Sequence, residues 1–596
     1  MTRYRQSWKR IIQKAVEEEA GAPVDADAVI IENPPRAELG DLAFPMFPYA
    51  PILKRSPREI ALRLAERISG AGAAQLSDQS GRVAAGAERV EVQGPYLNVH
   101  LDRPSVSSDV VAEVSKSLDL YGRGEDLAGQ RIILEFSAPN TNKPLHLGHL
   151  RNDALGMSVA RILESLGADV FKVNLINDRG VHICKSMLAY QRFGQGTTPE
   201  KRGQKGDHLV GDFYVRFAEW AKEDPRAEDL AKGMLKSWEE GDPGVRELWE
   251  RMNRWAIQGI EETYKKTGVA FDKIYRESET YLLGRKIVEL GLEKKVFYRG
   301  EDGSVWIDLS AEKLDKKVLL RSDGTSVYLT QDLGTAVQRY QDQPFDRMIY
   351  VVGNEQRYHF QVLFKVLELL GYNWAGNLYH LAYGMVNLPE GKMKSREGTV
   401  VDADDLIEDL QALAEDKIRG EEAEAEEFEV EDLQGTAEKV VLGALNYYLL
   451  QPSPLKDMIF DPKESLSFSG NTGPYLQYTG ARISSMLRKF NQRAGKFQGG
   501  TFKSELLEQP DEWLMVKQMA GYPETVVQAA RELNPSILTA ALFELAQTFN
   551  HYYHHNPVLH NEDRNLVVSR ITLAQTVRQV LYNGMRLIGI PFLDRM

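Results

Sequence analysis

The chain has little cysteine and no long apolar run, and each shortage excludes a class of structure. Cys184 is the single cysteine among 596 residues, which excludes intramolecular disulfides and zinc sites built from several cysteines. No stretch is apolar for long enough to span a bilayer, and residues 1–7 lack the hydrophobic core of a signal peptide. These absences predict a cytoplasmic protein with no membrane partner.

Positive charge is also in short supply. The formal net charge is −13, from 73 lysines and arginines against 86 aspartates and glutamates. Such a balance argues superficially against a nucleic-acid partner. Part of the excess is local, however, because acidic residues crowd positions 421–432, which we interpret as a solvated linker or helix face. A large RNA-binding enzyme can be acidic overall and still keep local basic surfaces.

The middle of the chain alternates between strand and helix patterns. This alternation, from about Arg131 to Val401, predicts a Rossmann-type α/β domain with a parallel, helix-covered sheet. A helical, charged pattern at about 195–300 predicts insertions within that domain. The site should lie where the strands end, near a topological switch point. The strand candidates are Arg131–Phe136, Asp169–Leu175, Met348–Val352 and Leu378–Met385.

The two flanks differ from this middle part. The N-terminal flank has a mixed pattern, which predicts a small α+β domain. The C-terminal flank has a helical pattern throughout, which predicts an all-α bundle. The predicted domains are 1–105, 106–435 and 436–596. Within the first, strands are expected at Val29–Glu32, Arg89–Val92 and Leu97–Leu101, and a helix at Arg58–Ile68.

Two histidines and a lysine lie between the end of a predicted strand and the start of a predicted helix. Lys143, His146 and His149 follow the apolar run Ile132–Phe136 and a turn rich in proline and asparagine. A helix N-terminus favours an anion, and Gly148 leaves room for a planar ligand or a phosphate. Two imidazole donors can stabilise charge on a five-coordinate phosphate, so the motif predicts nucleotidyl transfer.

The wider phrase around these histidines resembles a known family signature. Residues 137–152, SAPNTNKPLHLGHLRN, resemble the ATP-binding signature of class I aminoacyl-tRNA synthetases in the form found in arginyl-tRNA synthetases. Residues 391–398, GKMKSREG, resemble the second signature of that class, the Lys-Met-Ser-Lys-Ser loop, with the order shifted. Many arginyl-tRNA synthetases degrade this loop, and a lysine ahead of the two histidines substitutes. Lys143 occupies that place.

This resemblance implies roles for individual residues. It implies phosphate stabilisation by Lys143, His146, His149, Lys392 and Lys394 during catalysis, and ATP binding by Pro139, His146, Gly148, His149, Met393 and Ser395. Mg²⁺ is expected to accompany ATP, held mostly by substrate and water, and no zinc is expected. The family often carries a tryptophan where this chain has Arg179.

A pocket for arginine needs carboxylates, because a guanidinium is a planar cation with five donors. The resemblance implies that Tyr328 and Asp332 hold the side chain of the amino acid. It implies that Glu135, Asn140 and Gln356 hold its α-amino and neighbouring groups. Tyr328 and Asp332 are four residues apart, which places them on one face if the segment is helical.

The ends of the chain extend the resemblance. Residues 38–43 and 94–98 resemble the family's additional N-terminal domain, which contacts tRNA, although a purely structural role fits them too. Residues 469–482 and 587–591 resemble its helical anticodon-binding domain. Tyr475, Tyr478 and Arg482 share one helix face there, where they could stack tRNA bases or pack the bundle. The tryptophans at 220, 238, 249 and 255 are interpreted as core.

The function implied is that of an arginine–tRNA ligase. It would convert L-arginine and ATP to arginyl-adenylate and pyrophosphate, and then pass the arginyl group to the terminal adenosine ribose of tRNA(Arg), as a monomer. A class I synthetase for another amino acid would lack the carboxylates of Glu135 and Asp332. A catalytically silent tRNA-binding paralogue would lack a signature histidine or lysine, and only the altered 392–396 loop favours it.

Overall fold

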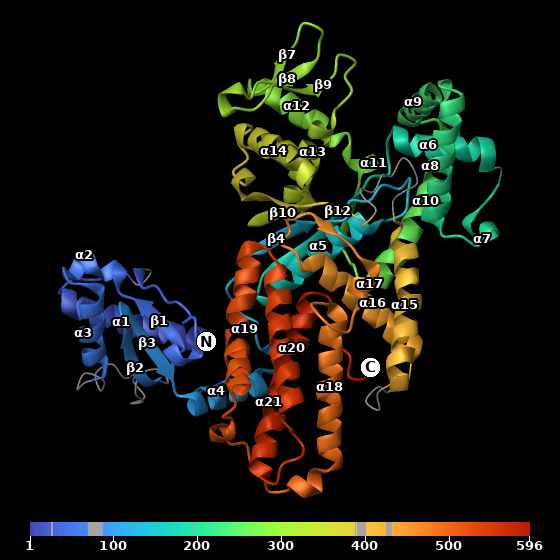
Figure 1. Cartoon of the computed structure of the whole chain (residues 1–596). Coiled ribbons are helices and arrows are strands. Elements are labelled where there is room, and N and C mark those ends of the chain that lie inside the picture. The colour runs from blue at the N-terminus through green and yellow to red at the C-terminus, as the bar shows by residue number, and fades with distance from the viewer. Residues whose placement is uncertain (26–27, 70–86, 195, 388, 390–400, 425–431) are drawn as a thin grey trace. The chain divides into compact units, whose positions relative to one another are not determined.

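The computed structural model describes residues 1–25, 28–69, 87–194, 196–387, 389, 401–424 and 432–596 (Figure 1). The chain divides into two units. Unit 1 comprises Met1–Gly122, Thr479–Val526 and Ala541–Asn583, and unit 2 comprises Arg123–Tyr478, Val527–Ala540 and Gly584–Met596. Among the described helices, none is long and apolar enough to cross a membrane.

The N-terminal part of unit 1 has the predicted α+β character. Its three-stranded antiparallel sheet has the order β1-β3-β2. The strand expected at Val29–Glu32 is wrong: only Glu32 pairs there, through one bridge to Ala43, because Pro34 and Pro35 follow and cannot donate to a ladder. The elements are α1 (Thr2–Ala20), β1 (Leu42–Pro45), α2 (Ala50–Leu53), α3 (Pro57–Ser69), β2 (Ala87–Gln93), β3 (Tyr96–Leu101) and α4 (Arg103–Ser117).

Asp41 joins this sheet to a C-terminal helix of the same unit. Its carboxylate accepts the backbone N–H of Leu101 at 3.0 Å and the indole N–H of Trp513, on α19 (Pro510–Glu532), at 2.9 Å. Lys517 lies 3.3 Å from the same carboxylate. Asp41 is itself buried. One residue of the phrase at 38–43 therefore has a clear structural role.

Unit 2 is built on a five-stranded parallel sheet with the order β11-β10-β4-β5-β6. The first of these strands in the chain, β4, is central, and the connections turn from one side of the sheet to the other between β4 and β10. That arrangement creates a switch point at their carboxyl ends. The strands are β4 (Arg131–Glu135), β5 (Asp169–Ile176), β6 (Lys273–Arg276), β10 (Arg347–Gly353) and β11 (Leu378–Tyr383).

Four of these strands match predicted ones, and β6 does not. Its four residues lie at the edge of the sheet, and only Tyr275 is buried, so the segment has no apolar run. The predicted helical insertion therefore ends earlier than residue 300. After β6 come α11 (Glu277–Thr280), α12 (Leu283–Glu293) and an antiparallel sheet of β7 (Tyr298–Arg299), β8 (Val305–Ile307) and β9 (Lys317–Leu320).

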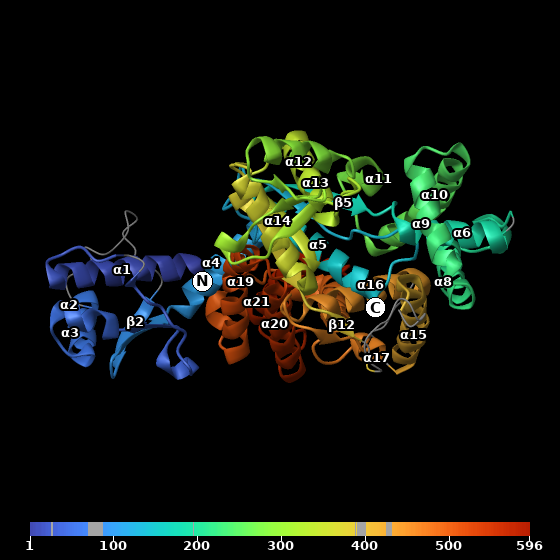
Figure 2. The same ribbon diagram turned by 90° about the horizontal axis from the view of Figure 1, so that it is seen from above.

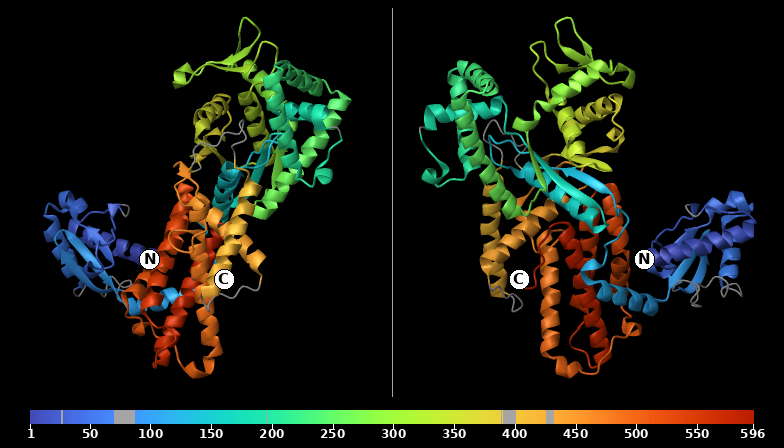
Figure 3. Two further views of the ribbon diagram at one scale, coloured as in Figure 1. Left: turned by 45° about the vertical axis from the view of Figure 1, so that its right-hand side comes forward. Right: turned by 180° about the vertical axis from the view of Figure 1, so that it is seen from behind.

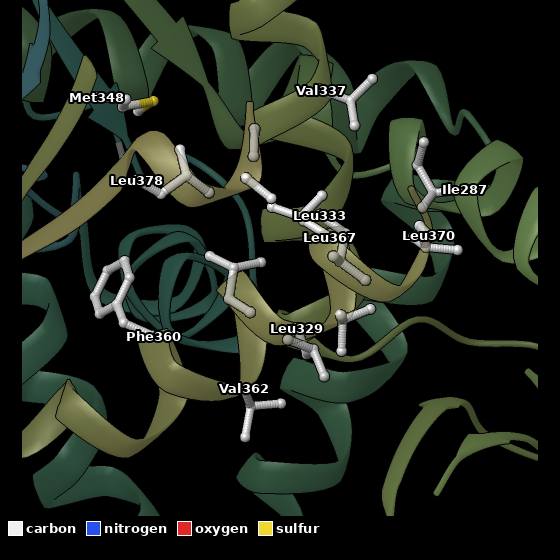
Figure 4. Packing of buried hydrophobic residues seen from close by; sticks show 14 of the residues in the cluster. Ile287, Leu329, Leu333, Val337, Met348, Phe360, Val362, Leu367, Leu370 and Leu378 are labelled. Carbon is white, nitrogen blue, oxygen red and sulfur yellow. The ribbon is translucent and has the colours of Figure 1, made fainter. Parts of the chain in front are cut away.

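Alternate residues of the sheet face two different layers. Ile133 and Met348 belong to a core with α12, α13 (Tyr328–Asp342) and α14 (Arg357–Leu369), which Figure 2 shows grouped together. Leu329, Leu333 and Leu367 contribute to the same core (Figure 4). Helix α5 (Leu147–Ser165) contacts β4, β5 and β10. The sheet thus fixes the start of α5 and the start of α14 near its carboxyl edge.

Helices between β5 and β6 form a bundle with its own core (Figure 3). Trp220 lies within that core, and Trp249 and Trp255 pack against it, as predicted. Trp238 is also buried. The helices are α6 (Val181–Ala189), α7 (Pro199–Arg202), α8 (Gly206–Glu223), α9 (Arg226–Glu239) and α10 (Pro243–Thr267).

The remainder of the chain is mainly helical, as predicted. The exception is a short parallel pair, in which β12 (Val386–Asn387) meets β13 (Met458–Ile459). The helices are α15 (Ala403–Glu424), α16 (Leu433–Leu450), α17 (Pro462–Ser465), α18 (Gly473–Gln492), α19, α20 (Ser536–His555) and α21 (Arg564–Leu587). Several of the acidic residues at 421–432 lie outside the described residues.

The Asp41 contact generates a stability prediction. Asp41→Ala should lower the free energy of unfolding of unit 1 by about 2–3 kcal/mol, because a buried indole N–H and a buried backbone N–H lose their acceptor. Glu38→Ala is the matched control, since Glu38 forms only an exposed ion pair with Arg36 and should change stability by less than about 0.5 kcal/mol. Urea unfolding measures both, and equal midpoints for the two variants would contradict the prediction.

Candidate functional site

The chain leaves β4 through a turn that L-amino acids rarely adopt. Ser137 and Ala138 have φ angles of 76° and 51°, which cost about 1–3 kcal/mol each. Two buried asparagines hold this conformation. Asn152 Oδ1 accepts the N–H of Ser137 at 2.5 Å, and Asn174 Oδ1 accepts the N–H of Ala138 at 3.0 Å. Side chains of α5 and β5 therefore determine the course of the turn.

Asn152 also connects this turn to the neighbouring strands. Its Nδ2 donates to the carbonyl of Val351 at 2.8 Å and to the hydroxyl of Tyr383 at 3.0 Å. Those residues belong to β10 and β11. One buried amide therefore links the carboxyl ends of three strands where the switch point lies.

His146 and His149 cap the start of α5 reciprocally. Nδ1 of His146 accepts the N–H of Gly148 at 3.1 Å, and Nδ1 of His149 accepts the N–H of His146 at 3.1 Å. A neutral imidazole has one acceptor and one donor nitrogen. Both rings must then carry their proton on Nε2, so the turn offers two Nε2–H donors.

Burial keeps both rings neutral. It lowers the pKa of His146 to about 3, with a further contribution from the charge of Lys143. It lowers the pKa of His149 well below 6.5, and His146 and Lys143 add to that shift. Burial also lowers the pKa of Lys143, and a bound anion would oppose this change.

The ring of His146 lies close to the Cα of Gly148. A Cβ at position 148 would lie 3.0 Å from Cε1 and 3.1 Å from Nδ1 of that ring. Such a contact is tighter than most, so the ring would have to shift by a few tenths of an ångström. The glycine between the histidines therefore makes room for the imidazole that caps the helix, in addition to any room it leaves for a ligand.

A cavity of about 550 Å³ opens at the switch point. This volume lies within the range of small-molecule and nucleotide sites. The cavity brings together predicted residues from two distant segments: Lys143, His146, Gly148 and His149 after β4, and Gln356 after β10. Its lining also includes Ser137, Ala138, Asn152, Val351, Val352, Gly353, Glu355, Tyr383, Gly384, Met385, Val386 and Asn387.

Glu135 ends β4, as predicted, and is buried against an internal guanidinium. Arg339 on α13 donates from Nη1 to Glu135 Oε2. Burial raises the pKa of Glu135, and Arg339 opposes that shift. Arg339 Nε and Nη2 and the hydroxyl of Tyr350 have no partner among the described residues. One oxygen of Glu135 is thus already engaged before any substrate binds.

Three more predicted arginine-binding residues, Tyr328, Asp332 and Asn140, are absent from the cavity lining. Tyr328 and Asp332 are in the first turns of α13, so the predicted helical spacing is confirmed. Asp332 Oδ2 pairs with Nε2 of His359 on α14 at 2.6 Å. Tyr328 is 74% exposed and forms no wall of a closed pocket here. Asn140 pairs with Asn177 in a parallel bridge.

Pro139, a predicted ATP-binding residue, is buried beside the same bridge. Its carbonyl accepts the N–H of Asn177 at 2.9 Å, and it is absent from the cavity lining. Its observed role is to hold the loops after β4 and β5 together. Lys392, Met393, Lys394 and Ser395 of the second signature lie outside the described residues.

Glu277 is a candidate that the sequence interpretation missed. It follows the last residue of β6 directly, whereas Glu135 is itself the last residue of β4, and it is 8% exposed. Burial raises its pKa to about 7, Arg179 opposes the shift, and Asp178 and Asp332 add to it. The sequence signal was its position after Lys273–Arg276, but that strand is too short and polar to recognise.

Arg179, at the position where a tryptophan was expected by resemblance, lies among aromatic rings. Its guanidinium lies 4.0 Å from the ring centroid of Tyr281 and 5.6 Å from that of Trp238, and it pairs with Glu239. A planar guanidinium stacks on aromatic rings much as an indole does. The charge of Arg179 also acts on the nearby carboxyl of Glu277.

The candidates in α18 have mixed surroundings. Tyr475, Tyr478 and Arg482 are all partly buried on a confirmed helix. Within unit 1, Arg482 donates to Asn550 at 2.6 Å and lies over the ring of Tyr553. These contacts favour packing for Arg482, and a role in binding tRNA stays a prediction for all three.

Comparisons with known proteins cover almost the whole chain. Residues 6–101 match the family described as arginyl tRNA synthetase N terminal domain, and residues 115–462 match tRNA synthetases class I (R), catalytic domain. Residues 476–596 match the DALR anticodon binding domain.

Similar proteins carry consistent names. Arginine–tRNA ligase of Treponema denticola is 53% identical over 99% of both chains, and that of Borrelia hermsii is 44% identical over 99% of this chain and 98% of its own. Among solved structures, Thermus thermophilus arginyl-tRNA synthetase has a TM-score of 0.77 and 26% identity, covering 99% of this chain and 100% of its own.

The reciprocal histidine cap generates a spectroscopic prediction. In ¹⁵N-histidine NMR spectra of the full chain, the rings of His146 and His149 should both show the Nε2–H tautomer. Neither should take up a proton between pH 5.5 and 8, because burial holds both pKa values below that window. His146→Gln and His149→Gln assign the signals. A ring protonated at Nδ1, or one that titrates near 6.5, would contradict the described geometry.

Proposed function

The chain belongs to the class I arginyl-tRNA synthetase family, and from that premise we propose how it acts as an arginine–tRNA ligase. It activates L-arginine with ATP to give arginyl-adenylate and pyrophosphate. It then transfers the arginyl group to the terminal adenosine ribose of tRNA(Arg). The arrangement of Lys143, His146 and His149 beside Gln356 in one cavity supports this proposal most directly.

In the activation step, a carboxylate oxygen of arginine attacks the α-phosphorus of ATP in line. The bond from that phosphorus to the β-phosphate oxygen breaks, and pyrophosphate leaves. His146 and His149 donate from Nε2 to phosphate oxygens as negative charge develops. Lys143 supplies positive charge beside them, and Lys392 and Lys394 add to it. Gly148, Pro139, Met393 and Ser395 complete the proposed ATP site.

Mg²⁺ fits this site as a partner of ATP. Glu355 is the one carboxylate in the described cavity lining. Mg²⁺ usually keeps several waters and binds through one or two carboxylates together with substrate phosphates. The ion would neutralise phosphate charge there, while the positions of the phosphates depend on the protein donors. The proposal includes no zinc.

We propose that the arginine end of the site combines several carboxylates. Asp332 and Tyr328 hold the guanidinium, and the free oxygen of Glu135 holds the α-amino group with Asn140 and Gln356. Glu277 adds negative charge near Asp332. The internal guanidinium of Arg339 supports this division, because it already engages one oxygen of Glu135, whereas the described partner of Asp332 is the imidazole of His359.

The wider functional setting is also proposed. Residues 1–105 would contact tRNA, and residues 436–596 would bind the anticodon, with Tyr475, Tyr478 and Arg482 as candidate contacts. The catalytic domain would span residues 106–435. We expect a cytoplasmic monomer.

An ATP–pyrophosphate exchange assay tests the proposal. It should be run with each of the twenty amino acids, with and without tRNA. Exchange that depends on arginine supports the proposal. Exchange with another amino acid would identify a different class I synthetase, and a protein that binds tRNA without exchange would be a silent paralogue.

Lys143 should act on the phosphates and not on arginine. Lys143→Ala should raise the activation barrier by about 2–4 kcal/mol, the scale of losing one preorganised transition-state contact. The KM for arginine should change little. Exchange kinetics measure both quantities, and near-normal exchange would assign the role to Lys392 or Lys394.

Asp332 should distinguish arginine from neutral analogues through its negative charge. Asp332→Asn keeps the size and one acceptor but removes the charge, so arginine should lose most of its apparent affinity while ATP binding stays near normal. Breaking a desolvated ion pair costs about 3–5 kcal/mol, and the partial exposure of Asp332 places the loss at or below the lower end.

The competitor for that measurement is citrulline, a neutral analogue of arginine. It should lose its disadvantage relative to arginine in the Asp332→Asn variant, because the charge that distinguishes them is gone. If the variant kept the wild-type preference for arginine, the guanidinium would be recognised elsewhere, and Glu135 and Glu277 would be the next residues to change.

A further inference from the structure

The main chain at His146 is held by a segment far away in the sequence. Residues 401–403 run antiparallel to residues 145–147. The N–H of Leu147 donates to the carbonyl of Val401 at 3.2 Å, and the N–H of Ala403 donates to the carbonyl of Leu145 at 3.0 Å. Asp402 faces His146 as the central pair of this bridge. The position of His146 therefore depends on what holds residues 401–403.

The next residue, Asp404, anchors that segment to two helices of the insertion. It lies near the start of α15 and is 3% exposed. Lys205, the N-cap residue of α8, and His208, on α8, approach its Oδ2, with His208 Nε2 at 3.3 Å. From α10, Thr263 donates to Oδ2 at 3.0 Å and Lys266 to Oδ1 at 3.2 Å.

The charges keep Asp404 ionised. Burial alone would raise the pKa of this carboxyl, but the hydrogen bonds from His208 and Lys205 hold it below its usual range. Removing one charged partner from such a buried group of charges is costly, because the remaining charges are left uncompensated. Figure 1 shows that α15 begins beside α10. These contacts therefore hold the start of α15 to α8 and α10.

Helix α8 also packs directly against the turn that carries Lys143 and Pro144. A Cβ at Gly211 would lie 2.9 Å from Cδ of Pro144, so the helix backbone packs closely against the residue after Lys143. Gly259 of α10 approaches Asp207 of α8 in the same way. Helices α8 and α10 are thus closely packed together and support the turn from one side while Asp404 holds its partner segment.

A metal ion is the alternative explanation for this cluster. His208, Asp207 and Asp404 are close enough together to bind one. The two lysines argue against it, because Lys205 and Lys266 already donate to both oxygens of Asp404. We therefore interpret the cluster as a network of ion pairs centred on Asp404.

We propose that Asp404 is a positioning residue for the activation step. It fixes residues 401–403, and through them His146 and His149, to helices α8 and α10. The inference rests on the proposed function, since it assumes that the two imidazoles act on ATP phosphates. It assigns a catalytic purpose to helices of the insertion that line none of the cavity at the switch point.

Asp404→Asn tests the proposal in the full-length enzyme. The number of active sites is counted by adenylate formation in a single turnover, so that misfolded protein does not enter the rate. Per active site, kcat for ATP–pyrophosphate exchange should fall about 10–100-fold, the scale of a displacement of about 1 Å in catalytic groups. The KM for arginine should stay within about twofold, because Asp332 and Glu277 lie on other elements.

Two further variants separate positioning from general effects. Asp404→Glu retains the carboxylate and should recover most of the lost kcat. The double variant Asp404→Asn with Lys205→Met should be no slower than Asp404→Asn alone, because the pair acts as a unit. Asp409→Asn removes one charge from an exposed position of the same helix and should leave kcat unchanged.

The outcomes distinguish this inference from the proposed function. Wild-type protein without arginine-dependent exchange would refute the function itself. With exchange present, a normal kcat per active site in Asp404→Asn would overturn the inference. So would a loss that consists only of fewer active sites, or an equal loss in Asp409→Asn.

Discussion

The geometry of the site depends on how the first turn of α5 satisfies its backbone N–H groups. Serine, threonine, asparagine and aspartate are the usual capping residues. Aspartate would cap the helix well but would place a negative charge next to a phosphate. Imidazole accepts the backbone N–H at Nδ1 without charge and still presents a donor at Nε2. In each ring, Nδ1 therefore stabilises the helix while Nε2–H remains available to an anion.

Burial gives the two ends of the site opposite electrical characters. At the end that we assign to the phosphates of ATP, it keeps His146 and His149 neutral, so that their rings do not repel Lys143. At the other end it raises the pKa of Glu135 and Glu277, and internal arginines oppose both shifts. The protein thus stabilises its buried carboxylates with its own guanidinium groups. A substrate with the same group meets an environment already suited to it.

Local patterns in the sequence were sufficient for some elements and not for others. Strand β4 and helix α5 follow from apolar periodicity and turn residues, whereas the helix that begins at Tyr328 was only a condition for placing Tyr328 and Asp332 on one face. The Glu135–Arg339 pair joins residues 204 positions apart, and no local pattern reports such a distance. Strand β6 was missed because a short edge strand needs few apolar residues, and Glu277 was missed with it.

The turn that carries His146 depends on contacts between parts of unit 2 that are far apart in the sequence. Residues 145–147 are complete only when paired with residues 401–403, and between them in the chain lie four of the five strands of the sheet. Contacts of such long separation form late, because the entropy of closing the loop must be overcome first. The strained turn at Ser137 and Ala138 adds to this requirement, since Asn174 can hold it only after β5 has joined β4. Local helix formation at α5 is therefore not sufficient to build the proposed phosphate site, whose described contacts come from the sheet, the insertion and the start of α15 together.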